Sequence, residues 1–283
     1  MSRIPFSQVL KNARIDLRRE YDRLYAMFAV FKNPGINGTS ATIKECCESC
    51  FINMPFRGTC ITLDDFDDVY DRHFEKSPRS VDMDYLVDFC EYSYNLVQYS
   101  QGFSYDGAMQ LVAYGYGQPL QFYMLQVMKV IETIGYMPIN QDGITIFVPK
   151  DQTAISVSEI VDPSLSYRVI EYNHHSMKGD LERKKAVLHK LADALEPQRP
   201  KLKGINSKLE DAVFFLFNNA NIRHNNSDPN GGYYNSTIAA MQQDELEKLY
   251  DDTYQLCLLA FLELDNVERK TKIQRLKEEI KGK

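Results

Sequence analysis

The sequence predicts an almost wholly α-helical protein in two parts. Apolar residues recur at three- and four-residue intervals through most of the chain, which is the period of amphipathic helices. Alternation typical of strands occurs at residues 136–148, where Asp142 and Gly143 form a turn pair that hairpins favour. We therefore predict an all-α fold: a helical N-terminal domain over 1–150 that ends in one short β-hairpin, and a C-terminal four-helix bundle over 151–283 with a charged tail.

The N-terminal domain is predicted to contain five helices with clear end signals. Pro34 and Gly35 end the first and Pro55 ends the second, while Pro119 suits the first turn of the fifth and Gly135 its C-terminus. The expected ranges are 6–31, 39–54, 61–76, 82–99 and 118–135, with a short helix and a loop between 103 and 116.

The C-terminal half is predicted to form an antiparallel bundle, because short connections join its helices. The expected ranges are 156–160, 163–175, 180–195, 207–218 and 244–265. Pro197 and Pro200 predict a turn before the helix at 207, and Ser207 and Glu210 are spaced as a capping box. The segment 266–283 is mostly charged, and we expect it to fray.

Composition sets limits on function. The 283 residues are 44% hydrophobic and 25% charged, ordinary values for a globular protein, and the net charge of −6 argues against a general nucleic-acid coat protein. The start of the chain is not that of a signal peptide, and no apolar run is long enough to span a membrane. We therefore expect a cytoplasmic protein. Phosphate-binding glycine loops, nucleophile elbows and dinucleotide fingerprints do not occur, and no cofactor is predicted.

Four cysteines lie close together at Cys46, Cys47, Cys50 and Cys60. The spacing of Cys47 and Cys50 would suit one half of a zinc site, but both lie in a helical pattern and a second pair is missing. Cysteine thiols are often buried in cores. We predict core thiols, no disulfides and no metal site.

The helix predicted at 61–76 carries an acidic face. Asp64, Asp67, Asp68 and Asp71 recur at helical spacing, so they lie on one side. They suit a solvated helix start, a divalent cation or a basic partner protein, and we keep a partner at this helix as an alternative.

The most unusual stretch follows the apolar helix at 207–218. Amides crowd around one guanidinium and one imidazole, in the order Asn219, Asn221, Arg223, His224, Asn225 and Asn226. Such a cluster suits recognition of a phosphate or an amide. The alternative is a solvated helix end, in which asparagine side chains cap backbone carbonyls.

Arg223 and His224 resemble the first two positions of the signature of the HEPN superfamily, helical bundles that include bacterial toxin and defence ribonucleases. The resemblance covers 156–265 and implies a homodimer with a metal-independent endoribonuclease site. The histidine that closes the family signature does not occur, because 227–230 read Ser-Asp-Pro-Asn. A catalytically inactive protein-interaction module is therefore the alternative.

The resemblance and the chemistry of RNA cleavage assign roles to these residues. Arg223 would stabilise the charged phosphorane and His224 would transfer one proton. Asn219, Asn221, Asn225 and Asn226 would contact the RNA substrate. A second polar junction at Glu171, His174 and His175 would also contact the substrate and could supply the other proton-transfer group, since we expect both junctions at the same end of the bundle.

A homodimer through the C-terminal half is also predicted on packing grounds. Phe214, Phe215 and Phe217 occupy successive faces of one helix, so the helix should be covered on both sides. Either the N-terminal domain or a second copy of the chain would supply that cover, and the resemblance implies a second copy.

Overall fold

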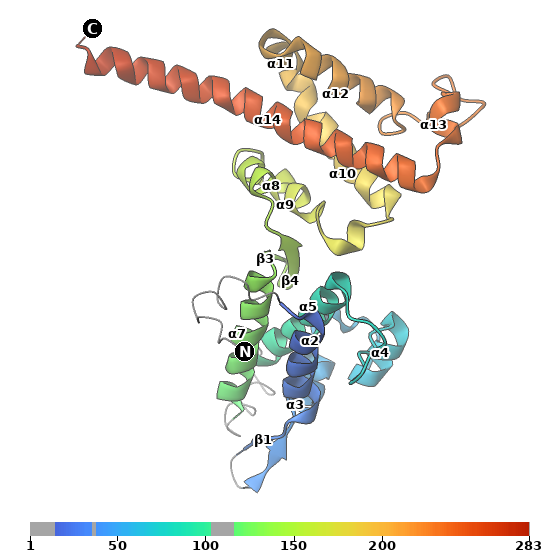
Figure 1. The fold of residues 1–283 in the computed structure, drawn as a ribbon, viewed down its shortest axis with the longest axis vertical. Coiled ribbons are helices and arrows are strands. Elements are labelled where there is room, and N and C mark those ends of the chain that lie inside the picture. The colour runs from blue at the N-terminus through green and yellow to red at the C-terminus, as the bar shows by residue number, and fades with distance from the viewer. Residues whose placement is uncertain (1–14, 36–37, 103–115, 283) are drawn as a thin grey trace, which may run out of the picture. The chain divides into compact units, whose positions relative to one another are not determined.

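The computed structural model describes residues 15–35, 38–102 and 116–282. The chain divides into two compact units, Met1–Phe147 and Val148–Lys283, and each has its own hydrophobic core. The division falls close to the boundary predicted near residue 150. The fold is all-α, with helices in both units and short two-stranded sheets in unit 1 (Figure 1). Within the described ranges, no helix has both the length and the apolar character needed to cross a bilayer.

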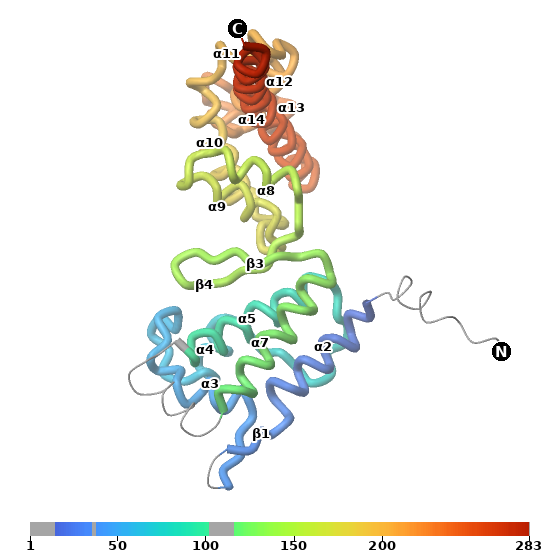
Figure 2. The backbone as a smooth tube through the Cα atoms, turned by 90° about the vertical axis from the view of Figure 1, so that its left-hand side faces the viewer, coloured from blue at the N-terminus to red at the C-terminus, as the bar shows by residue number. Residues whose placement is uncertain are grey.

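Unit 1 is built on three helices, α2, α5 and α7, that pack against one another (Figure 2). The helical elements of this unit are α2 Leu17–Tyr25, the π-helical turn η1 Ala26–Val30, α3 Ile43–Cys50, the 3-10 turns η3 Phe51–Asn53 and η4 Pro55–Arg57, α4 Leu63–Tyr70, α5 Met83–Gly102 and α7 Gly117–Thr133. All the helices predicted over the described parts of this unit are present, with shifted ends.

The predicted hairpin consists of β3 Tyr136–Gln141 and β4 Ile144–Pro149. Asp142 and Gly143 both have positive φ, 53° and 86°, as a tight hairpin turn with the favoured twist requires. A second pair of strands, β1 Asn33–Pro34 and β2 Ser40–Ala41, was not predicted. It consists of two residue pairs, too few for a periodic pattern in the sequence.

Two helices of unit 1 end earlier than predicted. The acidic helix predicted at 61–76 ends at Tyr70, because Asp71 adopts the left-handed conformation with φ 52°. The helix predicted to run to residue 54 ends at Cys50 and continues as short 3-10 turns. The predictions for residues 6–14 and 103–115 lie outside the described residues.

Unit 2 contains the predicted bundle, whose four longest helices are α9, α10, α12 and α14. Its elements are α8 Gln152–Ser158, α9 Pro163–Glu171, η5 His175–Met177, α10 Leu181–Leu195, η6 Glu196–Gln198, α11 Arg199–Ile205, α12 Ser207–Asn219, α13 Ser236–Ala240 and α14 Gln243–Ile280. Helix α14 packs against α8, α10, α11 and α12, so it is the central helix around which the unit is built.

The connection between α10 and α12 differs from the prediction. The two prolines do not open a turn there, because each lies in the first turn of a helical segment, η6 or α11, where a missing N–H costs nothing. The predicted capping box at Ser207 is also wrong. Asn206 caps α12 by accepting from the Leu209 amide at 3.1 Å, and the buried Glu210 instead pairs with Arg199 at 2.6 Å.

The apolar helix α12 is covered within its own unit. Phe214 and Phe217 are 1% and 0% exposed in the core of unit 2, whereas Phe215 is 59% exposed. The packing argument for a second copy at this helix therefore fails, because intrachain contacts already cover two of its three phenylalanines.

Helix α14 does not fray after residue 265 as predicted. It continues to Ile280 and extends past α11 (Figure 1). Asp265 pairs with Arg269 and Gln274 donates to Glu278 at 3.1 Å, both at i,i+4 spacing. Charged residues with long side chains favour helices, and such pairs add about 0.2–0.5 kcal/mol each.

Candidate functional sites

The segment Asn219–Asn235, here called the Asn/Arg/His loop, is organised by Asn226. This side chain is 1% exposed. Its Oδ1 accepts from the Asn221 amide at 2.8 Å, and its Nδ2 donates to the carbonyls of Asn218 and Tyr233 at 3.1 and 2.8 Å. The Asn221 side chain in turn accepts from the Asn226 amide at 3.1 Å. Asn226 therefore supplies the hydrogen bonds that a regular element would otherwise give this loop.

Arg223 is occupied by its own unit. Its Nη2 donates to the Ala192 carbonyl at 2.9 Å, and its Nη1 pairs with the Glu196 carboxylate. The guanidinium also lies over the rings of Phe217 and Phe214, at 5.3 and 5.8 Å from the ring centroids. Its side chain is 17% exposed. This arrangement fastens the loop to the C-terminal ends of α10 and α12.

The remaining predicted site residues of the loop lie closer to solvent. The His224 ring stacks on Tyr233, with centroids 3.8 Å apart and an interplanar angle of 7°. Asn219 donates back to the Phe215 carbonyl at 2.8 Å, and Asn225 accepts from Ser227 at 3.0 Å. Both amides therefore make local contacts within the helix end and the loop.

The second predicted junction, at Glu171, His174 and His175, has local partners of its own. The Glu171 carboxylate is 7% exposed and pairs with Arg168 and Arg183, each at 2.9 Å. The His174 Nδ1 lies 2.8 Å from the Ser176 hydroxyl, and the His174 and His175 rings are 4.2 Å apart. Arg183 is in the first turn of α10, whereas Arg223 is attached at Ala192, about 13 Å farther along that helix at 1.5 Å per residue. Glu171 is therefore paired at the first turn of α10, whereas Arg223 is attached near the C-terminal end of that helix.

A cluster that we did not predict as a site lies in unit 1, around Asp67 of α4. Asp67 is 4% exposed. Its two carboxylate oxygens accept from the Tyr92 hydroxyl at 2.8 and 3.0 Å, and the Lys44 ammonium lies 3.4 Å from Oδ2. Burial raises the pKa of Asp67, although its bonds to Tyr92 and Lys44 oppose this. Burial therefore disfavours the charged form of this carboxylate more than Tyr92 and Lys44 compensate.

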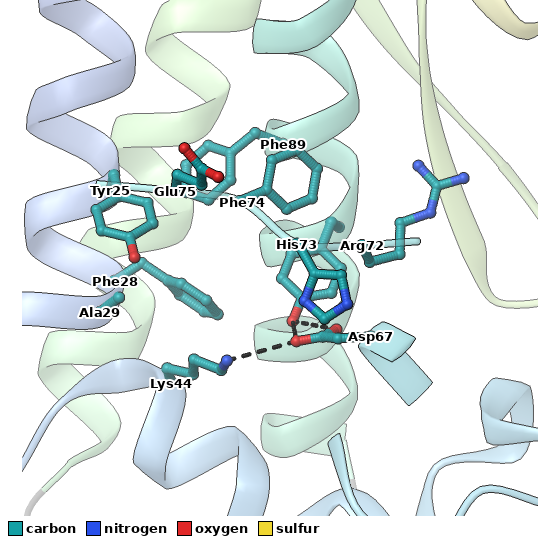
Figure 3. A pocket seen from close by; sticks show the side chains of 11 residues that line it. Tyr25, Phe28, Ala29, Lys44, Asp67, Arg72, His73, Phe74, Glu75 and Phe89 are labelled. Atoms are coloured by element: carbon teal, nitrogen blue, oxygen red, sulfur yellow. Dashed lines mark hydrogen bonds and ion pairs between the residues drawn. The ribbon is translucent and has the colours of Figure 1, made fainter. Parts of the chain in front are cut away.

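This carboxylate borders a cavity of about 240 Å³, here called the Asp67 pocket (Figure 3). Its walls are aromatic, and its other charged or polar lining residues are Lys44 of α3 and Arg72, His73 and Glu75, which follow α4. The aromatic lining residues are Tyr25, Phe28, Phe74, Phe89 and Tyr92.

The sequence contained part of the signal for this pocket. The spacing of the four aspartates predicts one acidic helix face. It does not predict that one of them, Asp67, is buried. Asp67 lies four residues after Leu63, which is 2% exposed, so both occupy the buried stripe of α4. An acid on an apolar stripe is the feature that could have identified it.

The cysteines are free thiols, and Cys46, Cys47, Cys50 and Cys60 are all buried, as predicted. Burial raises the pKa of Cys46 to about 12, which disfavours the thiolate that metal binding requires. Among the described residues, no group of metal-ligand side chains includes any of these four cysteines.

Comparison with known proteins adds no assignment: no family model, no curated protein and no solved structure matches this chain. The resemblance to the HEPN superfamily is not supported by these comparisons and stays a prediction.

Proposed function

We propose that the chain is a catalytically inactive helical interaction protein that pairs with a second copy of itself through the C-terminal part of α14. The observation that carries this proposal is the exposure of that part: every residue from Glu268 to Gly282 is exposed. Ile273, Leu276 and Ile280 are 51%, 48% and 76% exposed on a regular helix. Exposed apolar residues that line up on one helix face favour a partner.

The spacing of these residues supports a coiled coil. From Leu259 onward, positions on one face of α14 alternate at three- and four-residue intervals over three heptads, which is the a/d repeat of a two-stranded coiled coil. We call this face the α14 stripe. Its members are Leu259, Leu262, Asn266, Arg269, Ile273, Leu276 and Ile280.

The residue types on the stripe support a parallel pair of identical helices. Ile273 and Ile280 fall at a positions and Leu276 at a d position, and β-branched a residues with leucine at d favour two strands. Asn266 falls at an a position, where a single asparagine fixes register and strand number. Asp265 and Lys270 flank the stripe at g and e positions, so Asp265 of one helix would attract Lys270 of the other. Lys272 and Lys277 occupy the next g and e positions, where Lys272 of one helix would repel Lys277 of the other. The association should therefore be weak.

The geometry of the Asn/Arg/His loop supports the inactive form of the protein. The charge of Arg223 is already paired with Glu196, and Glu171 is held by Arg168 and Arg183. A cation that neutralises a transition state has to be available to the substrate phosphate. A ribonuclease of a bacterial defence or toxin system is the other candidate, and it rests on the resemblance at Arg223 and His224.

The test is sedimentation velocity on the full chain between about 1 and 200 μM, a range suited to weak pairing of short coiled coils. We expect a monomer–dimer equilibrium that Leu276→Glu abolishes. Gln274→Glu is the matched control, because it adds the same charge outside the stripe and should leave the equilibrium unchanged. A parent chain that stays monomeric throughout the range would contradict the proposal.

RNA cleavage is measured on the same samples. We expect none for the parent chain in the presence of EDTA. If the parent cleaves RNA and His224→Ala stops cleavage with the fold intact, the chain is a ribonuclease and the inactive assignment is wrong.

A further inference from the structure

The Asp67 pocket is small and shaped by aromatic rings. Its volume of about 240 Å³ is below the roughly 300–1,000 Å³ of pockets that hold drug-sized ligands, so a fitting ligand is small. The rings of Phe74 and Phe89, and of Phe74 and Tyr92, are 5.2 Å apart, and Phe28 lies 6.1 Å from both Phe89 and Tyr92. These rings support one another, so the walls are built before a ligand arrives.

The walls come from separate segments of unit 1 that meet around Asp67. Tyr25 and Phe28 belong to α2 and η1, Phe74 follows α4, and Phe89 and Tyr92 belong to α5. Figure 3 shows the Lys44 side chain directed toward Asp67 from α3. A cavity lined by rings and bordered by one buried charge has the composition of a binding site for a small molecule.

The two permanent cations at this cavity are already paired. Arg72 donates to Asp88 at 2.7 Å, and Figure 3 shows its guanidinium directed away from Asp67. The Lys44 ammonium lies 3.4 Å from Asp67, 3.8 Å from Asp64 and 4.0 Å from Glu48, so three carboxylates share one positive charge. His73 lies 3.0 Å from Asp68.

The pocket together with the carboxylates that pair with its two cations therefore has an excess of negative charge and would attract a cation. Glu75, another lining residue, adds a further carboxylate. Aromatic faces also favour cations, because their quadrupole is negative above the ring. An anionic ligand would have to compete with carboxylates for Lys44 and Arg72.

We propose that the Asp67 pocket binds a small organic ammonium ion, with its apolar body among the aromatic rings and its charged head at the Asp67 carboxylate. The two groups act together: the rings remove the ligand body from water, and Asp67 selects its charge. This site belongs to unit 1 and is independent of the pairing proposed for α14.

The charge requirement can be tested with two probes of similar size and opposite charge. We expect 2-phenylethylammonium to bind the full chain with a Kd of about 1 mM or tighter, as suits a ligand of this size, and phenylacetate to bind at least about tenfold more weakly. Calorimetry or ligand-detected NMR measures both. Two results would overturn the proposal: tighter binding of phenylacetate than of the ammonium probe, or no binding of the ammonium probe at about 10 mM, tenfold above the expected Kd.

Variants locate the site. Asp67→Asn keeps the shape of the side chain and should weaken binding of the ammonium probe by about tenfold or more, because it removes the charge that the ligand meets. Asp68→Asn is the matched control: its carboxylate is 74% exposed and does not line the pocket, so binding should be unchanged. Equal loss in both variants would show a non-specific acidic surface instead of a site. Circular dichroism on each variant confirms that the helices are intact.

Discussion

Two polar clusters stand out in this sequence, one rich in asparagine and one rich in aspartate. They differ in how fully the structure pairs their buried polar side chains. In the Asn/Arg/His loop of unit 2, the side chain of Asn226 is bonded at both its oxygen and its nitrogen to backbone groups of the loop and of the end of α12. In unit 1, Asp67 borders a cavity, and within the part of the chain that the structure describes its bonded side chains are Tyr92 and Lys44. A buried polar group thus indicates a binding site only when its protein partners leave some of its hydrogen bonds or its charge for a ligand to satisfy.

The largest effect should follow from loss of the Asn226 side chain. Asn226→Ala removes three hydrogen bonds and leaves buried backbone groups unpaired, so we expect a loss of about 3 kcal/mol in the free energy of unfolding of unit 2. Asn225→Ala is the matched control and should cost less than about 0.5 kcal/mol, because Asn225 is exposed. Urea unfolding followed by circular dichroism measures both. Equal losses would break the distinction between anchor and surface amides.

Arg223→Ala should destabilise unit 2 by about 2 kcal/mol, since it leaves the Ala192 carbonyl without its side-chain donor and removes contact with two rings. His224→Ala should cost about 0.5 kcal/mol or less, because it loses one ring stacking at the surface. Thermal unfolding of both variants compares them. A larger loss for His224→Ala would mean that the loop is fastened elsewhere.

Tyr92→Phe should be milder than Arg223→Ala, with a loss of about 1 kcal/mol in the free energy of unfolding of unit 1, although it removes a hydrogen bond to a carboxylate. Water in the cavity can replace the lost hydroxyl, and Lys44 keeps its contact with Asp67. A loss as large as that of Asn226→Ala would show that Asp67 is a structural anchor like Asn226. Urea unfolding of this variant beside the parent gives the answer.

The smallest effect concerns pH. The folded pKa of Asp67 is raised above its ordinary 3.8 by burial, so the folded state holds this proton more tightly than the unfolded state. Its contribution to stability is present below about pH 3.8 and is lost as pH rises through the folded pKa. Asp67→Asn should remove that decline, which begins above about pH 3.8, from the stability of unit 1. An unchanged pH profile in the variant would contradict the raised pKa.

The sequence predicted the helices well and the roles of polar residues less well. Periodicity places α5, α7, α10 and α12 because their apolar stripes repeat over several turns. It does not place the end of α4, which depends on the left-handed backbone of one residue, Asp71. The continuation of α14 was missed because a charged composition was interpreted as fraying, although the same residues favour helix.

Pairing between residues that are distant in sequence is what sequence patterns do not show. Arg223 was predicted as a catalytic cation because its partner Glu196 lies 27 positions away in sequence and becomes a neighbour only in the folded bundle. Asp67 was grouped with exposed acids because Tyr92, 25 positions away, gives no local sign of its bond. In both cases the residue type indicates a charged group. Only the fold shows which of these groups already have a partner within the chain.

A pair of isosteric exchanges tests the central contrast most directly. Asn226→Asp turns two donated hydrogen bonds into contacts between a carboxylate and carbonyl oxygens, so we predict a loss of at least about 3 kcal/mol in unit 2. Asp67→Asn removes a buried charge and keeps an acceptor for Tyr92, so we predict a change within about 0.5 kcal/mol in unit 1. Hydrogen exchange followed by mass spectrometry reports each unit separately in the same chain. Loss of protection in unit 1 as large as that in unit 2 would contradict the account.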